Sequence, residues 1–175
     1  MTKGRLHGLL GCLVLGLFVS VGALATGAGA ASPESVTITA KEYFPATGDQ
    51  KITIEATGGV FSALSSGTGE STMNTLGSPT SGGHRSAFVY HGVDVYATNV
   101  GTQGTFTFMW AFTCKYSSAT DSLCAGPWHI TGGTGAYEGA QGGGTALDLC
   151  VDKYVNGVYD STSCDDTLTG KIQVP

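Results

Sequence analysis

A glycine-rich stretch at residues 126–145, GPWHITGGTGAYEGAQGGGT, constrains the fold of this chain more than any other segment. Glycine is favoured where the backbone needs a positive φ or where another backbone comes close. Apolar residues inside the stretch, Ile130, Tyr137 and Ala140, argue against a disordered linker. We therefore expect a sharply turned connection between two β-strands, with Gly133 or Gly135 in a backbone conformation closed to other residues.

The segment 103–116 is the strongest predicted strand. Phe106, Phe108, Trp110 and Phe112 share one face of it, and the other face carries mainly threonine and small apolar residues. Four large rings in a row would make an apolar patch beyond what soluble monomers usually expose. We therefore expect the ring face to point into a closed or sandwiched sheet, with Trp110 near the middle of the strand.

Alternation of apolar and polar residues predicts further strands. They lie at 36–40, 52–55, 87–98, 146–155, 158–160 and 168–174, and a strand followed by a long loop is expected within 58–83, with a turn at 79–83. Gly92 inside a strand pattern predicts a bulge. Seven to nine strands result, and the low content of charged and helix-forming residues after residue 30 agrees with an all-β fold.

The N-terminus is typical of a secretory signal peptide over residues 1–30. Lys3 and Arg5 precede an apolar run at 9–24, and small residues follow. We expect an exported single domain at 31–175 with no stable membrane insertion after cleavage. Without Lys3 and Arg5, six basic side chains face thirteen acidic ones, a formal charge of −7. Nucleic acid is a poor partner for that surface.

Four cysteines follow the leader: Cys114, Cys124, Cys150 and Cys164. An even number in an exported chain predicts two disulfides. Of the three pairings we favour Cys114–Cys124 and Cys150–Cys164, because each pair brackets a polar turn. Zinc is the alternative, disfavoured because no C-x-x-C spacing exists and the histidines lie far away. We expect no metal and no cofactor.

The second of these pairs needs an irregularity in the sheet. The dipeptide at 156–157, Asn-Gly, predicts a two-residue type I′ turn that pairs Val155 with Val158. That register places Cys150 opposite Ser163. A bulge must therefore absorb one residue if Cys150 is bonded to Cys164.

Within the glycine-rich stretch, the order Gly-Gly-Thr-Gly-aromatic-x-x-Ala-x-Gly resembles the signature of the allene oxide cyclase and dirigent superfamily. The matching residues are Gly132, Gly133, Thr134, Gly135, Tyr137, Gly139, Ala140 and Gly142. The resemblance implies one closed or nearly closed antiparallel eight-stranded barrel, here stapled by disulfides. It implies that six of these residues form a structural turn: Gly132, Gly133, Thr134, Gly135, Tyr137 and Gly142. Members of the superfamily cyclise a fatty-acid epoxide, steer coupling of phenoxy radicals or close polyketide rings. All bind an apolar substrate inside the barrel, and the signature itself carries over no catalytic residue.

Candidate reactive groups are few. No G-x-S-x-G, H-E-x-x-H or Walker motif is present in the sequence. The histidines after the leader are general-base candidates, although surface positions are more typical; they are His84, His91 and His129. Acidic residues gather near the C-terminal hairpin without EF-hand spacing, so we expect a solvated acidic face rather than a calcium site. These are Asp148, Asp152, Asp160, Asp165 and Asp166.

The predicted site is the barrel lumen. Its candidate ligand-contacting residues are Phe106, Phe108, Trp110, Phe112, Tyr90 and Tyr96, and His91 or Glu138 is a further candidate to orient a ligand. We expect a secreted barrel that binds or shapes a small apolar molecule. The alternatives are a cyclase or isomerase acting on an apolar substrate, and a cell-envelope interaction or structural module with a filled barrel. An acid or base facing an open lumen would favour the enzyme, and a large exposed apolar patch would favour the module. The sequence leaves the oligomeric state open.

Overall fold

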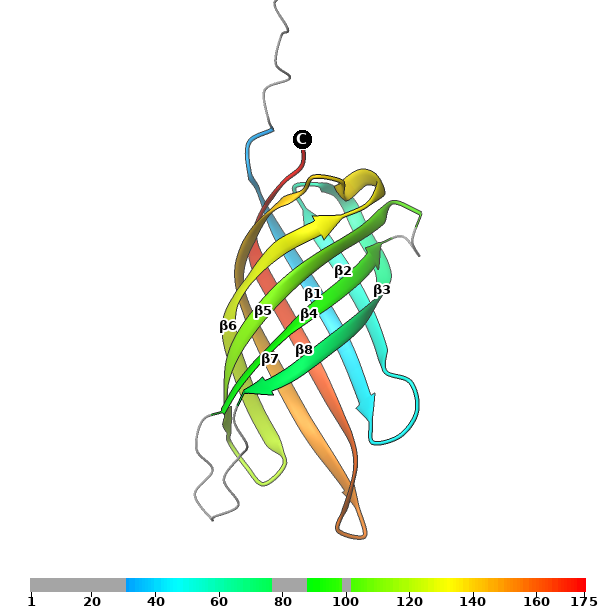
Figure 1. Cartoon of the computed structure of the whole chain (residues 1–175), viewed down its shortest axis with the longest axis vertical. Helices are drawn as coiled ribbons and strands as arrows, with labels where there is room; N and C mark the ends of the chain where they lie inside the picture. Colours follow the sequence, from blue (N-terminus) through cyan, green and yellow to red (C-terminus); the bar gives the residue numbers. More distant parts are fainter. Residues whose placement is uncertain (1–30, 77–87, 99–101) are drawn as a thin grey trace, which may run out of the picture.

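The structure, a computed structural model, describes residues 31–76, 88–98 and 102–175, without the side chains of 62–64, 73–76 and 88. The predicted signal peptide, the turn at 79–83 and His84 lie outside these residues. The described chain forms one closed barrel of eight strands in sequence order (Figure 1). Each strand pairs antiparallel with the next, and the last pairs back with the first. The predicted all-β, eight-stranded barrel is confirmed.

The strands are β1 (Glu34–Pro45), β2 (Lys51–Gly58), β3 (Phe61–Leu76), β4 (Phe88–Thr98), β5 (Gly104–Tyr116), β6 (Asp121–Gly133), β7 (Gln141–Val155) and β8 (Val158–Gln173). A one-turn 3-10 helix, η2 (Gly135–Tyr137), joins β6 to β7. None of the described residues forms a helix long and apolar enough to cross a bilayer. The two separate strands expected at 158–160 and 168–174 are one strand, β8, because the acidic residues between them continue the same inward and outward alternation.

Strict alternation of side chains produces the barrel wall. On β1, Val36, Ile38 and Ala40 are buried and the residues between them are exposed. The threonines of the outer surface are β-branched and fit a pleated sheet as well as valine does. Along regular stretches of strand the interior therefore receives every second residue, so the chemistry of the lumen depends on which residues face inward.

The glycine-rich stretch forms the predicted sharp connection. Gly135 has φ +60°, and a Cβ at Gly133 would collide with the backbone carbonyl of Tyr137. The prediction that one of these two glycines occupies a restricted conformation is confirmed at Gly135. The turn directs Tyr137 into the barrel, where its hydroxyl lies 2.6 Å from Thr98 Oγ1 and donates to Gln103 Oε1 at 2.8 Å. Tyr137 thereby closes one end of the barrel.

Both predicted disulfides are present. Cys114 on β5 lies opposite Cys124 on β6, and Cys150 on β7 lies opposite Cys164 on β8, with Cα atoms 4.0 and 4.1 Å apart. The predicted irregularity is also present. Val155 pairs with Val158, and the register then shifts between Lys153 and Tyr154. The positive φ values at 156 and 157, 52° and 79°, are those a type I′ turn requires.

The bulge predicted at Gly92 is wrong. The β4–β5 register runs without a shift from Phe88 opposite Cys114 to Thr98 opposite Gly104. Gly92 lies directly opposite Trp110, and a Cβ there would be 2.5 Å from Cζ2 of the indole. The glycine makes room for the tryptophan ring inside the barrel.

Candidate ligand pocket in the barrel lumen

One half of the lumen is filled. Phe106 and Phe108 are each 1% exposed and pack edge-on against Tyr96, whose ring centroid lies 5.7 and 4.8 Å from theirs. Phe61 and Tyr137 complete this aromatic core toward the closed end. Three of the predicted ligand-contacting residues, Phe106, Phe108 and Tyr96, are therefore packing residues of the core.

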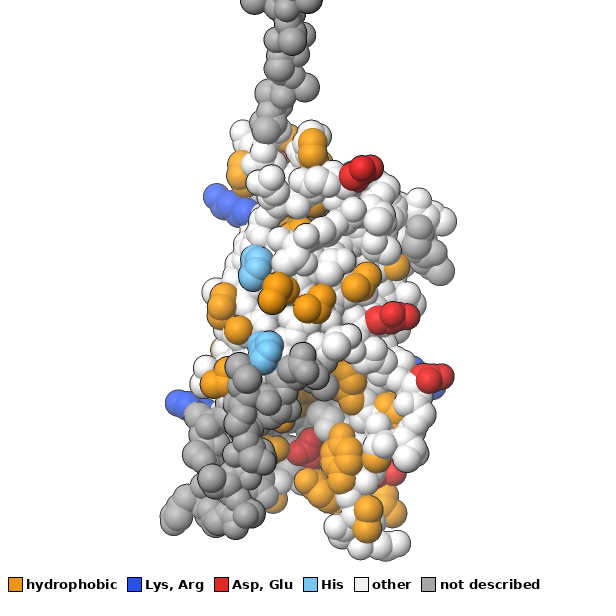
Figure 2. Space-filling model, viewed as in Figure 1, with side chains coloured by type: hydrophobic (Ala, Val, Ile, Leu, Met, Phe, Trp, Pro, Cys, Tyr) orange, Lys and Arg blue, Asp and Glu red, His pale blue; other side chains and the backbone are white. Residues whose placement is uncertain are grey.

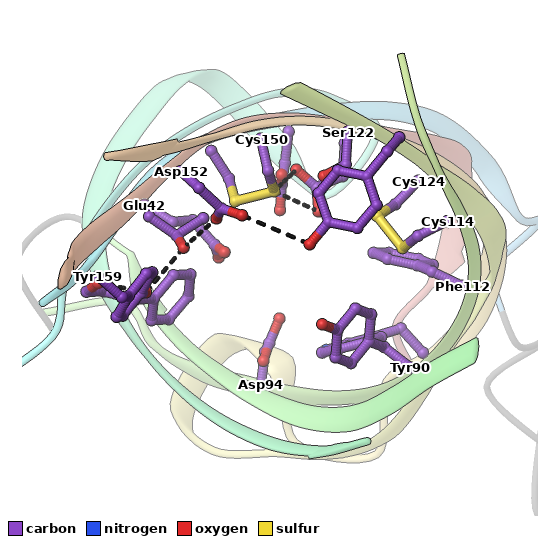
Figure 3. Close-up of a pocket in the computed structure, with 17 residues that line it drawn as sticks. Glu42, Tyr90, Asp94, Phe112, Cys114, Ser122, Cys124, Cys150, Asp152 and Tyr159 are labelled. Carbon is purple, nitrogen blue, oxygen red and sulfur yellow. Dashed lines mark hydrogen bonds between the residues drawn. A yellow bond between two sulfur atoms is a disulfide. The ribbon is translucent and has the colours of Figure 1, made fainter. Parts of the chain in front are cut away.

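The other half of the lumen contains a pocket of about 250 Å³ (Figure 3). Trp110 and Phe112 form part of its wall, stacked with ring centroids 4.6 Å apart. Tyr90 and both disulfides also line it. Three of the predicted ligand-contacting residues, Trp110, Phe112 and Tyr90, thus surround this space. Tyr159, 40% exposed, stands at its rim, and Figure 2 shows acidic atoms at a hollow near that end of the barrel.

Four buried carboxyl groups enter the pocket from four strands. They are Glu42 on β1, Asp94 on β4, Asp148 on β7 and Asp166 on β8, and each is at most 8% exposed. The predicted solvated acidic face is therefore wrong for Asp148 and Asp166. It is right for Asp165, which is exposed, and for Asp160, which pairs with Lys153 at 3.1 Å; Asp152 is partly buried and lines the pocket.

Burial disfavours ionisation of the carboxyl groups of Glu42 and Asp94. Desolvation, with the charges of Asp94 and Asp148, raises the pKa of Glu42 from 4.5 to about 8, against a hydrogen bond from the Tyr96 hydroxyl at 3.1 Å. Desolvation raises the pKa of Asp94 from 3.8 to about 6, although the side chains of Ser71 and Trp110 partly offset it. Near neutral pH, Asp94 is thus mainly ionised and Glu42 mainly protonated.

Asp148 and Asp166 form a carboxyl pair. They face each other across β7 and β8, in the wall of the pocket. Burial raises the pKa of both, and two carboxylates this close do not both ionise. The pKa of Asp166 is raised to about 11, so Asp166 is protonated over the neutral range. Both oxygens of Asp148 also touch Cys150 Sγ, at 3.1 and 3.2 Å, a contact in which the disulfide sulfur has no hydrogen to donate.

The lumen lacks a compensating positive charge within the described chain. The pocket-lining residues there include no Lys, Arg or His, and the described lysines are all exposed. Asp94 Oδ1 and Asp166 Oδ1 are buried without a hydrogen-bond partner. An unpaired acceptor in a site of low dielectric is unfavourable. The pocket thus presents net negative charge, two unsatisfied carboxyl oxygens and one unsatisfied donor, Trp110 Nε1, to whatever enters it.

A compact metal site does not explain these carboxyls. In the described part of the chain, the only three potential ligands with atoms within 4.8 Å of one another are Asp148, Cys150 and Cys164. The two cysteines are bonded to each other, so they are not thiolate ligands. The carboxyls of Glu42 and Asp94 project into the lumen from different strands, β1 and β4 (Figure 3). The acidic groups surround a space wider than one metal ion.

The other predicted polar residues lie elsewhere. His129 is exposed on the outer surface, and His91 alternates with Tyr90 and Gly92, so it does not line the pocket. Histidine side chains are visible on the outside of the wall (Figure 2). Glu138 is exposed beside η2, at the closed end. The predictions that His91 or Glu138 orients a ligand in this pocket are wrong.

The outer surface carries an apolar strip on β6 and β7. It consists of Leu123, Leu147, Leu149 and Val151, between 43% and 52% exposed. Leu123 and Leu149 lie directly opposite each other in the sheet.

Comparisons with known proteins add no relative: no protein-family model, curated protein or solved structure matches this chain.

Proposed function

We propose that this protein is an exported β-barrel that binds a small, mainly apolar molecule in its lumen. The observation that carries the proposal is the pocket of about 250 Å³ whose wall includes the stacked rings of Trp110 and Phe112. Apolar walls with a few convergent polar groups are typical of small-molecule sites. The signal-like N-terminus and the two disulfides support export. The glycine-rich signature and the strand number support membership of the allene oxide cyclase and dirigent superfamily.

A fluorescence titration tests this function. The chain has two tryptophans, and Trp128→Phe leaves Trp110 as the only one. In that background, N-phenyl-1-naphthylamine, a neutral apolar fluorophore, should quench Trp110 and gain emission by energy transfer. Trp110→Ala in the wild-type chain should weaken probe binding while circular dichroism still reports a folded barrel. Probe binding unchanged by Trp110→Ala, or absent from a folded protein, would contradict the proposal.

An isomerase or cyclase is a second candidate, favoured by the Asp148–Asp166 pair. A protonated carboxyl, Asp166, beside a second carboxyl, Asp148, places a proton donor next to a potential proton acceptor, which is what a proton transfer within one substrate requires. The pair lies in the wall of the pocket rather than on the outside of the barrel. On this reading the protonated member protonates the substrate and the ionised member accepts a proton from it.

Hydrogen exchange separates catalysis from binding. A ligand that co-purifies with the exported protein should be incubated with fresh protein in D₂O and examined by mass spectrometry. Deuterium incorporation or a changed product, lost in Asp166→Asn and kept in Asp165→Asn, would establish the enzyme. Recovery of the unchanged ligand from both proteins would leave binding as the function.

The apolar strip on β6 and β7 favours the interaction module, the third candidate. Leu149→Ser together with Val151→Ser would remove its two most exposed side chains. A module should lose association with isolated cell envelope after this change, whereas a lumenal binding protein should not. The pocket in the lumen argues against a fully filled barrel.

A further inference from the structure

The chemistry of the pocket restricts the charge of its ligand. A purely apolar molecule would cover Trp110 and Phe112 but would leave the carboxyl groups of the pocket without a charge partner. Asp94 is only 4% exposed, and its Oδ1 has no partner within the described chain. Burying such a group further, beneath an apolar ligand, adds to its desolvation. A ligand that supplies positive charge removes this cost.

The distribution of the acids around the lumen favours an organic cation over a metal ion. Glu42, Asp94 and the Asp148–Asp166 pair lie on β1, β4, β7 and β8, around the lumen rather than at one point. No three of these carboxyls have oxygens within 4.8 Å of one another. A small metal ion would contact too few of them, whereas an ammonium group with carbon substituents fills a wider space and still lies near several charges.

The aromatic residues of the pocket also favour a cationic ligand. A cation over the face of Trp or Tyr is attracted by the ring quadrupole, and desolvation strengthens the attraction. Trp110 and Phe112 stack in the pocket wall, and Tyr90 and Tyr116 also line the pocket. Burial raises the pKa of Tyr90, and burial with the charge of Asp152 raises that of Tyr116 to about 12. Both phenols are neutral near pH 7 and offer uncharged rings.

We propose that the lumen pocket binds a small organic cation, an amine or quaternary ammonium compound with an aromatic or apolar body. The ionised carboxyl of Asp94 faces the charge, and the rings of Trp110 and Phe112 contact the body. This inference rests on the proposed lumenal binding function and adds the class of ligand. It differs from that function because it requires a positive charge on the ligand. A neutral molecule of the same shape tests this requirement.

Binding is expected to depend on pH. The titratable groups that face the pocket are Glu42, Asp94, Tyr90, Tyr116, Asp148, Asp152, Tyr159 and Asp166. A bound cation favours the ionised form of each acid, so binding releases protons, and acidification opposes binding. Because the pKa of Asp94 is about 6, affinity for a permanently charged cation should fall as the pH decreases from 7.5 to 4.5.

The test compares phenyltrimethylammonium with tert-butylbenzene, which has the same shape and no charge. Isothermal titration of the exported full-length protein at pH 7.5 should show the cation bound at least tenfold more tightly. Its affinity should fall about tenfold in Asp94→Asn and at least tenfold in the wild type at pH 4.5. The neutral compound should bind the wild type and Asp94→Asn equally, and the exposed control Asp165→Asn should match the wild type with both compounds.

Other results of these titrations would overturn the proposal in different ways. Equal affinity for the two compounds, or a cation affinity unaffected by both Asp94→Asn and Glu42→Gln, would overturn the charge requirement and leave lumenal binding intact. Stoichiometric binding of Ca²⁺ alone, in competition with phenyltrimethylammonium, would replace the organic cation by a metal. Binding of neither compound to a folded protein would overturn both the inference and the proposed function for ligands of this size.

Discussion

Replacing Asp94 by asparagine should stabilise the barrel above pH 6 and leave it little changed at pH 4. Asparagine has the same shape but does not ionise. In the folded protein, burial raises the pKa of Asp94 from 3.8 to about 6. A carboxyl whose pKa is higher in the folded state contributes its full stability below pH 3.8, and that contribution is lost as the pH rises through about 6.

The size of the effect follows from the two pKa values. A tenfold change in proton affinity is worth about 1.4 kcal/mol, so the full rise corresponds to about 3 kcal/mol. The wild type should lose about this much unfolding free energy through Asp94 between pH 4 and pH 8, and the variant should not. Asp94→Asn also removes a charge that raises the pKa of Glu42, which changes the difference in the same direction.

Urea denaturation followed by tryptophan fluorescence at pH 4, 5, 6, 7 and 8 measures this difference. The curves of wild type and variant should diverge as the pH rises, with most of the divergence complete by pH 7. Asp165→Asn removes an exposed carboxyl of β8 and should run parallel to the wild type. A constant offset between Asp94→Asn and the wild type at every pH would refute the argument that Asp94 ionises at a desolvation cost.

Three further predictions concern the barrel itself. Gly135→Ala should lower the unfolding free energy by more than ~1 kcal/mol, because φ is +60° at this position. Gly132→Ala should cost less, because a new Cβ there would have nothing within 4 Å, and equal losses in urea titrations would contradict this. Replacing Cys114 and Cys124 together by serine should cost about 2–4 kcal/mol on the same assay, and an unchanged midpoint would show that the bond does not constrain the unfolded chain. Tyr137→Phe should cost about 1–2 kcal/mol, because Thr98 and Gln103 lose a buried partner, while Tyr43→Phe, at an exposed ring, should be neutral in thermal melts.

The wall of the barrel could be predicted from the sequence because its signals are local. The ring stripe of β5 and the type I′ dipeptide each determine structure within a few residues of themselves. The hairpin register even required the bulge that the structure contains between Lys153 and Tyr154. The bulge prediction at Gly92 failed because the glycine accommodates the ring of Trp110 on the neighbouring strand. A contact between two strands cannot be recognised from the sequence of one of them.

The acids of the pocket were missed because β4 and β7 invert the usual pattern. On β7, Leu147 and Leu149 face outward, and Asp148 faces the lumen. Apolar residues beside an acid normally indicate that the acid is the exposed one. The positions of the cysteines along the strands could have predicted which acids face inward. Asp148 has the parity of Cys150, and Asp166 has that of Cys164, so disulfides inside the barrel imply acids inside it.

The two tryptophans allow the most direct test of lumenal binding. Trp110 lines the pocket, while Trp128 is buried at 2% exposure and its indole N–H donates to the carbonyls of Thr145 and Thr169 at 3.2 and 3.3 Å. Two-dimensional NMR of the ¹⁵N-labelled protein, assigned with Trp128→Phe, resolves the two indole N–H signals. Saturation with phenyltrimethylammonium should shift the Trp110 signal strongly and the Trp128 signal little. Binding that leaves the Trp110 signal in place would contradict the account, because the ligand would then lie outside the pocket.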